Sequence, residues 1–220
     1  MLKAVVFDLD GTLLDTIHDI AGALNCALEE CGLPTHPVRA FEAFVGGGIR
    51  EAVRKASPEG TQEELLDRVL AAYHREYVAH CTDRTDCYPG IREMLSGLSG
   101  QGLALGVLSN KTQATAQKII AHYFPGAGFR FVFGRVDGRP LKPDPGAAEP
   151  VLAALDVPPE EIAYVGDSGS DMAFARAVGM LPAAAPWGYR TREELAREGA
   201  ALLPGSPTEL LEQILALAAQ

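Results

Sequence analysis

The sequence predicts an α/β protein: a Rossmann-like parallel sheet core with helices on both faces, plus an inserted all-helical domain. Two observations carry this prediction. Short apolar runs alternate with helix-like segments over most of the chain, which is the order that a parallel sheet requires. One long block breaks the alternation and contains only helical patterns. Because the alternation resumes afterwards, the block is predicted to be an insertion into the core.

Four apolar runs are predicted to be strands because they are short and end in glycine or polar residues. They cover residues 2–7, 103–109, 129–133 and 161–166. Weaker strands are expected near residues 180–184 and 200–203.

The segments between these runs have helical spacing. They cover residues 112–124, 145–157, 170–179 and 191–199, with Thr112 and Thr191 as predicted caps. A last helix is expected over 206–220, docked on the sheet.

The domain boundaries follow from the helical block. Residues 16–85 show helical patterns only, punctuated by the turn at Gly32 to Pro34. We therefore expect an α/β core domain of residues 1–15 and 86–220, and a helical domain of residues 16–85.

Composition narrows the class of partner. The 220 residues are 47% hydrophobic and 22% charged, which is typical of a globular enzyme. The formal net charge of −10 argues against nucleic acid, because binding phosphate backbones requires a surplus of Lys and Arg. A small phosphorylated metabolite stays compatible, since one metal ion and one lysine can invert the local field.

No apolar stretch is long enough to span a bilayer, and the first residues do not resemble a signal peptide. We therefore expect a cytoplasmic protein, with no membrane partner, that is a monomer or a homodimer. The four cysteines are expected to be reduced thiols, with a regulatory disulfide as the alternative.

Carboxylates follow the first predicted strand at once. Asp8 and Asp10 come directly after a fully apolar run, and Gly11 lets the chain turn away sharply. Because side chains alternate along an extended backbone, the two carboxylates can point to the same side. Ligands of open parallel sheets bind at the carboxyl ends of strands, so a functional site is expected here.

Polar residues follow the other predicted strands. Ser109, Asn110 and Lys111 succeed the run at 103–109, although a polar turn that caps the next helix explains them equally well alone. Lys142 precedes a proline, which restricts its backbone; a surface lysine is the alternative.

A second pair of carboxylates follows the run at 161–166. Asp167 would emerge at the strand tip beside Asp8, and Asp171 would sit in the first turn of the next helix. A carboxylate set without nearby His or Cys ligands favours a hard cation, and Mg²⁺ is the natural one.

These four clusters resemble, in identity and order, the motifs of the haloacid dehalogenase superfamily of aspartate-nucleophile phosphatases. The resemblance rests on "DLDGT", on Ser109 after a strand, on Lys142 before a proline, and on "GDSGSD". The segments "VGGGIREAV", "YPGIREML" and "WGYRTREEL" are similar to the phosphoglycolate phosphatase branch. The helical block resembles the cap domain of that superfamily.

The resemblance implies a role for each residue. Asp8 would be the nucleophile that forms an aspartyl phosphate, and Asp10 the general acid and base. Ser109 and Lys142 would bind phosphoryl oxygens. Asp8, Asp167 and the carbonyl of Asp10 would hold Mg²⁺. Asp171 would orient Lys142 and the metal ligands.

Other residues are expected to bind the substrate. Thr12 and Asn110 adjoin the motifs. Arg50, after the glycines 46–48 of the cap, and Lys111 are candidates for an anionic end such as a carboxylate. A solvated arginine is the alternative for Arg50.

The predicted function is therefore hydrolysis of a small phosphate monoester by a phosphatase of the phosphoglycolate type. A phosphosugar mutase or a pyrophosphatase of the same superfamily, and a catalytically silent binding protein, are the alternatives. A dehalogenase is disfavoured because Asp10 is present.

Overall fold

The computed structural model describes residues 1–219, and its contacts divide the chain into two compact units. One unit, here the α/β unit, contains Met1–Leu14 and the chain from Cys87 onward. The other, here the helical unit, is Asp15–Asp86. The sequence placed the limits of the insertion at residues 16 and 85.

The α/β unit is built on a five-stranded sheet in the order β5-β4-β1-β6-β7, with every strand pair parallel. The strands are β1 (Ala4–Phe7), β4 (Ala104–Thr112), β5 (Phe129–Arg135), β6 (Ile162–Gly166) and β7 (Leu181–Ala184). The predicted parallel sheet is confirmed. Because β1 lies between β4 and β6, the carboxyl ends of three neighbouring parallel strands meet at one edge of the sheet, where a site is expected.

The prediction of a strand at 200–203 is wrong. Leu202 forms a single bridge to Ala183 and the chain then turns away. Gly199, with a positive φ of 88°, and Pro204 limit this extended stretch on both sides, so it is too short for a strand.

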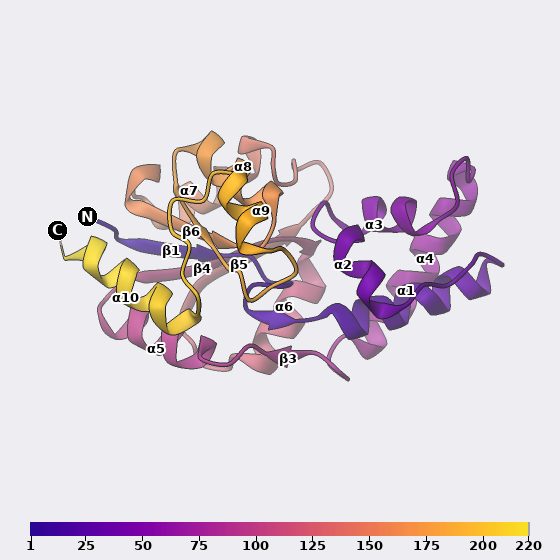
Figure 1. Ribbon diagram of the computed structural model, residues 1–220, viewed down its shortest axis with the longest axis horizontal. Coiled ribbons are helices and arrows are strands. Elements are labelled where there is room, and N and C mark those ends of the chain that lie inside the picture. Colours follow the sequence, from indigo (N-terminus) through magenta and orange to yellow (C-terminus); the bar gives the residue numbers. More distant parts are fainter. Residues whose placement is uncertain (220) are drawn as a thin grey trace. The chain divides into compact units, whose positions relative to one another are not determined.

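Helices cover both faces of the sheet (Figure 1). One face carries α5 (Ile91–Gly100), α6 (Gln113–Tyr123) and α10 (Pro207–Ala218), and the other carries α7 (Glu149–Leu155) and α8 (Gly169–Val178). The connections hold α9 (Arg192–Arg197) and the 3₁₀ helices η2 (Pro145–Ala148) and η3 (Pro159–Glu161). Helix α10 packs on α5, and residue 220 of the predicted last helix lies outside the described residues.

The two predicted caps differ. Thr191 forms a reciprocal capping box with Glu194 at the start of α9, as predicted. Thr112 precedes α6, but its hydroxyl donates to the Thr115 hydroxyl and caps no backbone N–H.

The helical unit contains α1 (Ile17–Glu30), η1 (Val38–Ala40), α2 (Phe41–Phe44), α3 (Ile49–Ala56) and α4 (Glu63–His80). Within the predicted helical block, the segment between α2 and α3 is not helical, because Gly46 and Gly48 take positive φ angles of 118° and 89°. Helix α1 packs along α4. Where the chain passes between the units, β2 (Leu14–Asp15) pairs with β3 (Asp86–Cys87).

A buried aspartate joins the two ends of the helical unit. The Asp19 carboxylate, in the first turn of α1, accepts from the backbone N–H groups of Arg84 and Thr85 and from the Thr85 hydroxyl, at 2.8–3.1 Å. These bonds tie the start of the unit to the residues just before β3. Among residues 1–219, no helix combines the length and the apolar character that crossing a membrane demands.

Candidate active site

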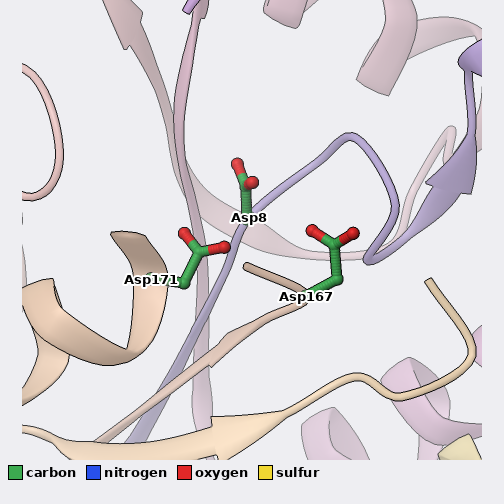
Figure 2. A group of neighbouring side chains, drawn as sticks. All are labelled: Asp8, Asp167 and Asp171. Carbon is green, nitrogen blue, oxygen red and sulfur yellow. The ribbon is translucent and has the colours of Figure 1, made fainter. Parts of the chain in front are cut away.

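Three buried carboxylates gather at the carboxyl edge of the sheet. Asp8 follows β1, Asp167 follows the neighbouring strand β6, and Asp171 lies in the first turn of α8. One oxygen atom from each lies within 4.8 Å of the other two. Figure 2 shows the three side chains side by side. The parallel pairing of β1 with β6 explains the juxtaposition, since both strands end at the same height.

Two glycines allow the chain to approach Asp167. A Cβ on Gly11 would lie 2.2 Å from Asp167 Oδ2, and Gly11 also takes a positive φ of 75°. A Cβ on Gly188 would lie 2.1 Å from the Gly11 carbonyl oxygen and 2.5 Å from Asp167 Cβ. Any larger side chain at either position would displace the loop or the carboxylate.

The loop after β7 holds Asp167 and the loop after β1. The backbone N–H of Tyr189 donates to Asp167 Oδ2 at 2.9 Å, and the indole N–H of Trp187 donates to the Thr12 carbonyl at 2.9 Å. We call Trp187–Tyr189 the clasp. Sequence reasoning used this segment only as a family likeness and missed these contacts.

A buried lysine lies among the carboxylates. Lys142 Nζ is 3.0 Å from Asp8 Oδ1, 2.7 Å from Asp171 Oδ1 and 2.6 Å from the Tyr164 hydroxyl. The Asn110 side chain bonds the backbone N–H and carbonyl of Lys142, each at 3.0 Å. Both the backbone and the ammonium of Lys142 are thus fixed.

The electrostatics follow from this burial. Burial raises the pKa of Asp8 to about 6, although Lys142 opposes the shift. Burial, and then the charge of Asp171, raise the pKa of Asp167 well above its usual range. Burial alone would lower the pKa of Lys142, but the charges of Asp171 and Asp8 outweigh it and raise that pKa well above its ordinary value. The lysine is therefore a permanent cation beside an excess of carboxylate.

Asp171 uses both its oxygens within the chain. Oδ1 accepts from Lys142, and Oδ2 accepts from the backbone N–H and the hydroxyl of Ser168. These bonds complete the capping box of α8. Asp171 is thus better suited to orient Lys142 than to bind a metal ion.

A second ion pair lies at the same edge. Lys111 Nζ is 3.1 Å from Asp10 Oδ1, and the lysine side chain is only 7% exposed. The hydroxyl of Ser109 is buried nearby and accepts from the Lys111 backbone N–H at 3.3 Å. The structure thus brings Asp8, Asp10, Ser109, Lys111 and Lys142 to one edge of one unit.

The remaining predicted substrate contacts have other positions. Thr12 is fully buried, and its hydroxyl has no hydrogen-bond partner within residues 1–219. The Asn110 side chain bonds the backbone of Lys142, and its contact with substrate stays a prediction. Arg50 lies in the helical unit, where it pairs with Glu63 at 2.9 Å and Asp67 at 2.6 Å.

The residues fit a divalent cation. Asp8 Oδ1 is buried and, despite the nearby Lys142, makes no hydrogen bond within the described part of the chain. Burial raises the pKa of both Asp8 and Asp167, and a cation bound between them would favour their ionised forms. An all-oxygen set of this kind suits Mg²⁺. Asp8 and Asp167 could hold such an ion.

This fold and this edge of carboxylates define a class of enzyme. The family model described as "Haloacid dehalogenase-like hydrolase" matches residues 5–185, and the chain belongs to this family. The predicted family, the α/β fold and the assignment as a hydrolase are thereby confirmed.

The relatives narrow the class further. The chain is 33% identical to a phosphoglycolate phosphatase of Pseudomonas syringae pv. tomato, over 99% of this chain and 82% of the relative. It is 35% identical to a phosphoglycolate phosphatase of Chromobacterium violaceum, over 96% of both chains. A crystal structure from Lactobacillus delbrueckii subsp. bulgaricus, of a protein whose predicted activity is that of a phosphoglycolate phosphatase, superposes with a TM-score of 0.91. That structure is 32% identical and covers 96% of this chain and 98% of its own. The predicted enzyme class, a phosphoric monoester hydrolase, is that of these relatives.

Proposed function

We propose that this chain is a Mg²⁺-dependent phosphatase that hydrolyses a small phosphate monoester through an aspartyl phosphate on Asp8. One observation carries the proposal. Asp8 Oδ1 is buried and close to the ammonium of Lys142, yet makes no hydrogen bond within residues 1–219. Its lone pairs are thus available to attack an electrophile, which is the property that a nucleophilic carboxylate needs.

The reaction divides into two transfers. In the first, a carboxylate oxygen of Asp8 bonds to phosphorus while the bond from phosphorus to the ester oxygen breaks. Asp10 gives its proton to the departing alcohol. In the second, water attacks the same phosphorus, Asp10 takes a proton from that water, and inorganic phosphate leaves with Asp8 restored. Asp10 lies two residues from Asp8, on the same edge, as this exchange requires.

Three other groups stabilise the charge that moves. Lys142 would bind one phosphoryl oxygen, and the Ser109 hydroxyl would donate to another. When bound by Asp8, Asp167 and the Asp10 carbonyl, Mg²⁺ would screen the repulsion between the anionic nucleophile and the anionic phosphate. Asp171 would keep Lys142 aimed.

Phosphoglycolate is the first substrate to test, because the relatives that match almost the whole chain carry that name. Its carboxylate needs a cation. Lys111 is the better placed candidate, since it lies at the same edge as Asp8 and Asp10. Lys111 would have to exchange one carboxylate, Asp10, for the substrate, whereas Arg50 would have to exchange two, Glu63 and Asp67. In this proposal the helical unit acts as a cap that excludes water, and the enzyme works in the cytoplasm.

Release of inorganic phosphate tests the proposal. The purified chain is incubated with phosphoglycolate, p-nitrophenyl phosphate and pyrophosphate, with Mg²⁺ or with excess EDTA. The expected result is Mg²⁺-dependent release that is fastest with phosphoglycolate. Preference for pyrophosphate, or conversion of a sugar phosphate to its isomer without release, would assign the site to the alternative activities. No release from any ester would contradict the proposal.

A further inference from the structure

We infer that Tyr164 is a positioning residue whose hydroxyl aims the Lys142 ammonium and ties it to the strand that carries Ser109. The inference rests on the proposed function, because it gives the hydroxyl a purpose in phosphoryl transfer. Tyr164 lies in the middle of β6, three residues before Asp167, and its side chain is completely buried. The sequence places it in the apolar run just before Asp167, and sequence reasoning gave it no role.

The ammonium of Lys142 has two hydrogen-bond acceptors and one further ion-pair partner. Tyr164 accepts at 2.6 Å and Asp171 at 2.7 Å, and Asp8 lies at 3.0 Å. Tyr164 is the neutral member of the set. It therefore holds the ammonium in place without adding negative charge to a site that already has an excess.

The direction of these hydrogen bonds is determined. Burial raises the pKa of Tyr164 well above its ordinary value, so the hydroxyl stays protonated. Its single proton goes to the Leu108 carbonyl at 2.8 Å, and its lone pair receives the proton of Lys142. Leu108 directly precedes Ser109 in β4. One hydroxyl thus links the two residues proposed to bind phosphoryl oxygens.

A purely structural role explains the ring of Tyr164 but leaves the hydroxyl unexplained. The ring lies edge to face with Phe174 at 5.0 Å and belongs to the core beneath α7 and α8. Phenylalanine would fill that space equally well. A buried hydroxyl loses its hydration, so its two short bonds to the site are the reason that tyrosine rather than phenylalanine suits this position.

Removal of the hydroxyl should misplace Lys142. In Tyr164→Phe the ammonium keeps the ring, 5.2 Å from its centroid, and the two carboxylates. We expect it to move toward the carboxylates, away from the position for a phosphoryl oxygen. We expect kcat to fall about 10- to 100-fold, as is usual for residues that orient a catalytic group. KM should change less than about threefold, because the other groups proposed to bind the substrate, Ser109, Lys111 and the metal ion, stay in place.

The experiment compares Tyr164→Phe with Phe174→Leu in Mg²⁺-dependent hydrolysis of phosphoglycolate and p-nitrophenyl phosphate. Phe174→Leu disturbs the packing of the same ring but leaves the hydroxyl in place. Its expected result is a lower Tm with kcat within about threefold of wild type. Lys142→Met, alone and combined with Tyr164→Phe, completes a double-mutant cycle.

The outcomes separate the two roles. If the hydroxyl acts through Lys142, adding Tyr164→Phe to Lys142→Met lowers kcat no further. Equal loss of kcat in Tyr164→Phe and Phe174→Leu, or full additivity in the cycle, would overturn the inference. If Tyr164→Phe does not fold, the inference is overturned in favour of a structural role. A wild-type chain that releases no phosphate would overturn the proposed function itself, whereas an active wild type with an equally active Tyr164→Phe rejects only the inference.

Discussion

The indole N–H of Trp187 donates to the carbonyl oxygen of Thr12 at 2.9 Å, across 175 residues of sequence. This bond, with the bond from Tyr189 to Asp167, makes the clasp part of the site. The clasp fixes one oxygen of Asp167 and the loop that carries Asp10. If Asp167 binds Mg²⁺ as proposed, the clasp links metal affinity to residues far from the acidic motifs.

Gly188→Ala should weaken Mg²⁺ binding, because the new Cβ would meet the Gly11 carbonyl at 2.1 Å and Asp167 Cβ at 2.5 Å. Displacing a ligand in this way typically lowers affinity about 10- to 100-fold. Isothermal titration with Mg²⁺ measures this directly. Gly22→Ala is the matched control, since a Cβ on Gly22 meets no atom within 4 Å. Equal affinities in the two variants would exclude a role for the clasp.

Asp8→Asn should abolish turnover while the protein stays folded. The amide nitrogen or oxygen cannot replace the carboxylate as nucleophile, so kcat should fall below about a thousandth of the wild-type value. Phosphate release measures activity and circular dichroism measures folding. A folded variant with more residual activity would remove Asp8 from the mechanism.

The stability of the metal-free protein should depend on pH through Asp8. Burial raises the pKa of Asp8 to about 6, above the value of about 3.9 in an unfolded chain. Between these values the folded protein binds more protons than the unfolded chain. Its free energy of unfolding therefore falls as pH rises from about 4 to about 6, and the loss is complete above about 6. The upper bound of this loss is roughly 3 kcal/mol.

Thermal unfolding in EDTA, from about pH 4.5 to about pH 8, compares the wild type with Asp8→Asn. The variant should be at least as stable as the wild type at the upper limit, and its advantage should shrink toward the lower limit. A variant that is clearly less stable at high pH would show that Asp8 stabilises the fold through Lys142 instead.

Lys111→Met should change substrate preference. If Lys111 binds a carboxylate, its loss should lower kcat/KM for phosphoglycolate about 10- to 100-fold more than for p-nitrophenyl phosphate, as expected for one charge-assisted bond. Arg50→Met is the parallel variant in the helical unit. If only Arg50→Met changes the ratio, the carboxylate belongs to Arg50.

Asp19→Ala should destabilise the protein by about 2–3 kcal/mol, because it removes the acceptor of two backbone N–H groups and leaves the Thr85 hydroxyl only the Cys81 carbonyl at 3.3 Å. Denaturant unfolding measures the change. Asp83→Ala removes an exposed carboxylate close by in the sequence, paired with His80, and should cost less than about 0.5 kcal/mol. Comparable losses would contradict the role of Asp19.

The sheet and its carboxylate edge could be predicted because they depend on local patterns. Short apolar runs ending in Asp8 and Asp167 identify strands, and parallel strands end at a shared edge. The end of helix α2 at Phe44 was harder to predict. Three glycines follow it, and the sequence does not show which of them turns the chain.

The contacts of Tyr164, Asn110 and Trp187 could not be predicted in the same way. Each depends on residues that lie tens of positions away: Leu108 for Tyr164, Lys142 for Asn110 and Thr12 for Trp187. The sequence alone does not determine which partner a tyrosine inside an apolar run, or an asparagine after a strand, will bond. Only the packed structure selects one of them.

The paired strands β2 and β3 have a consequence for how such a chain can diversify. The chain departs at Leu14 and returns at Cys87 on adjacent strands, and every group proposed for the phosphoryl chemistry is encoded outside that excursion. Insertions, deletions or replacement of the whole segment within residues 15–86 would therefore leave the sequence of the five-stranded sheet uninterrupted. Recombination at the β2–β3 pair would exchange the helical unit and leave the proposed reaction centre as it was.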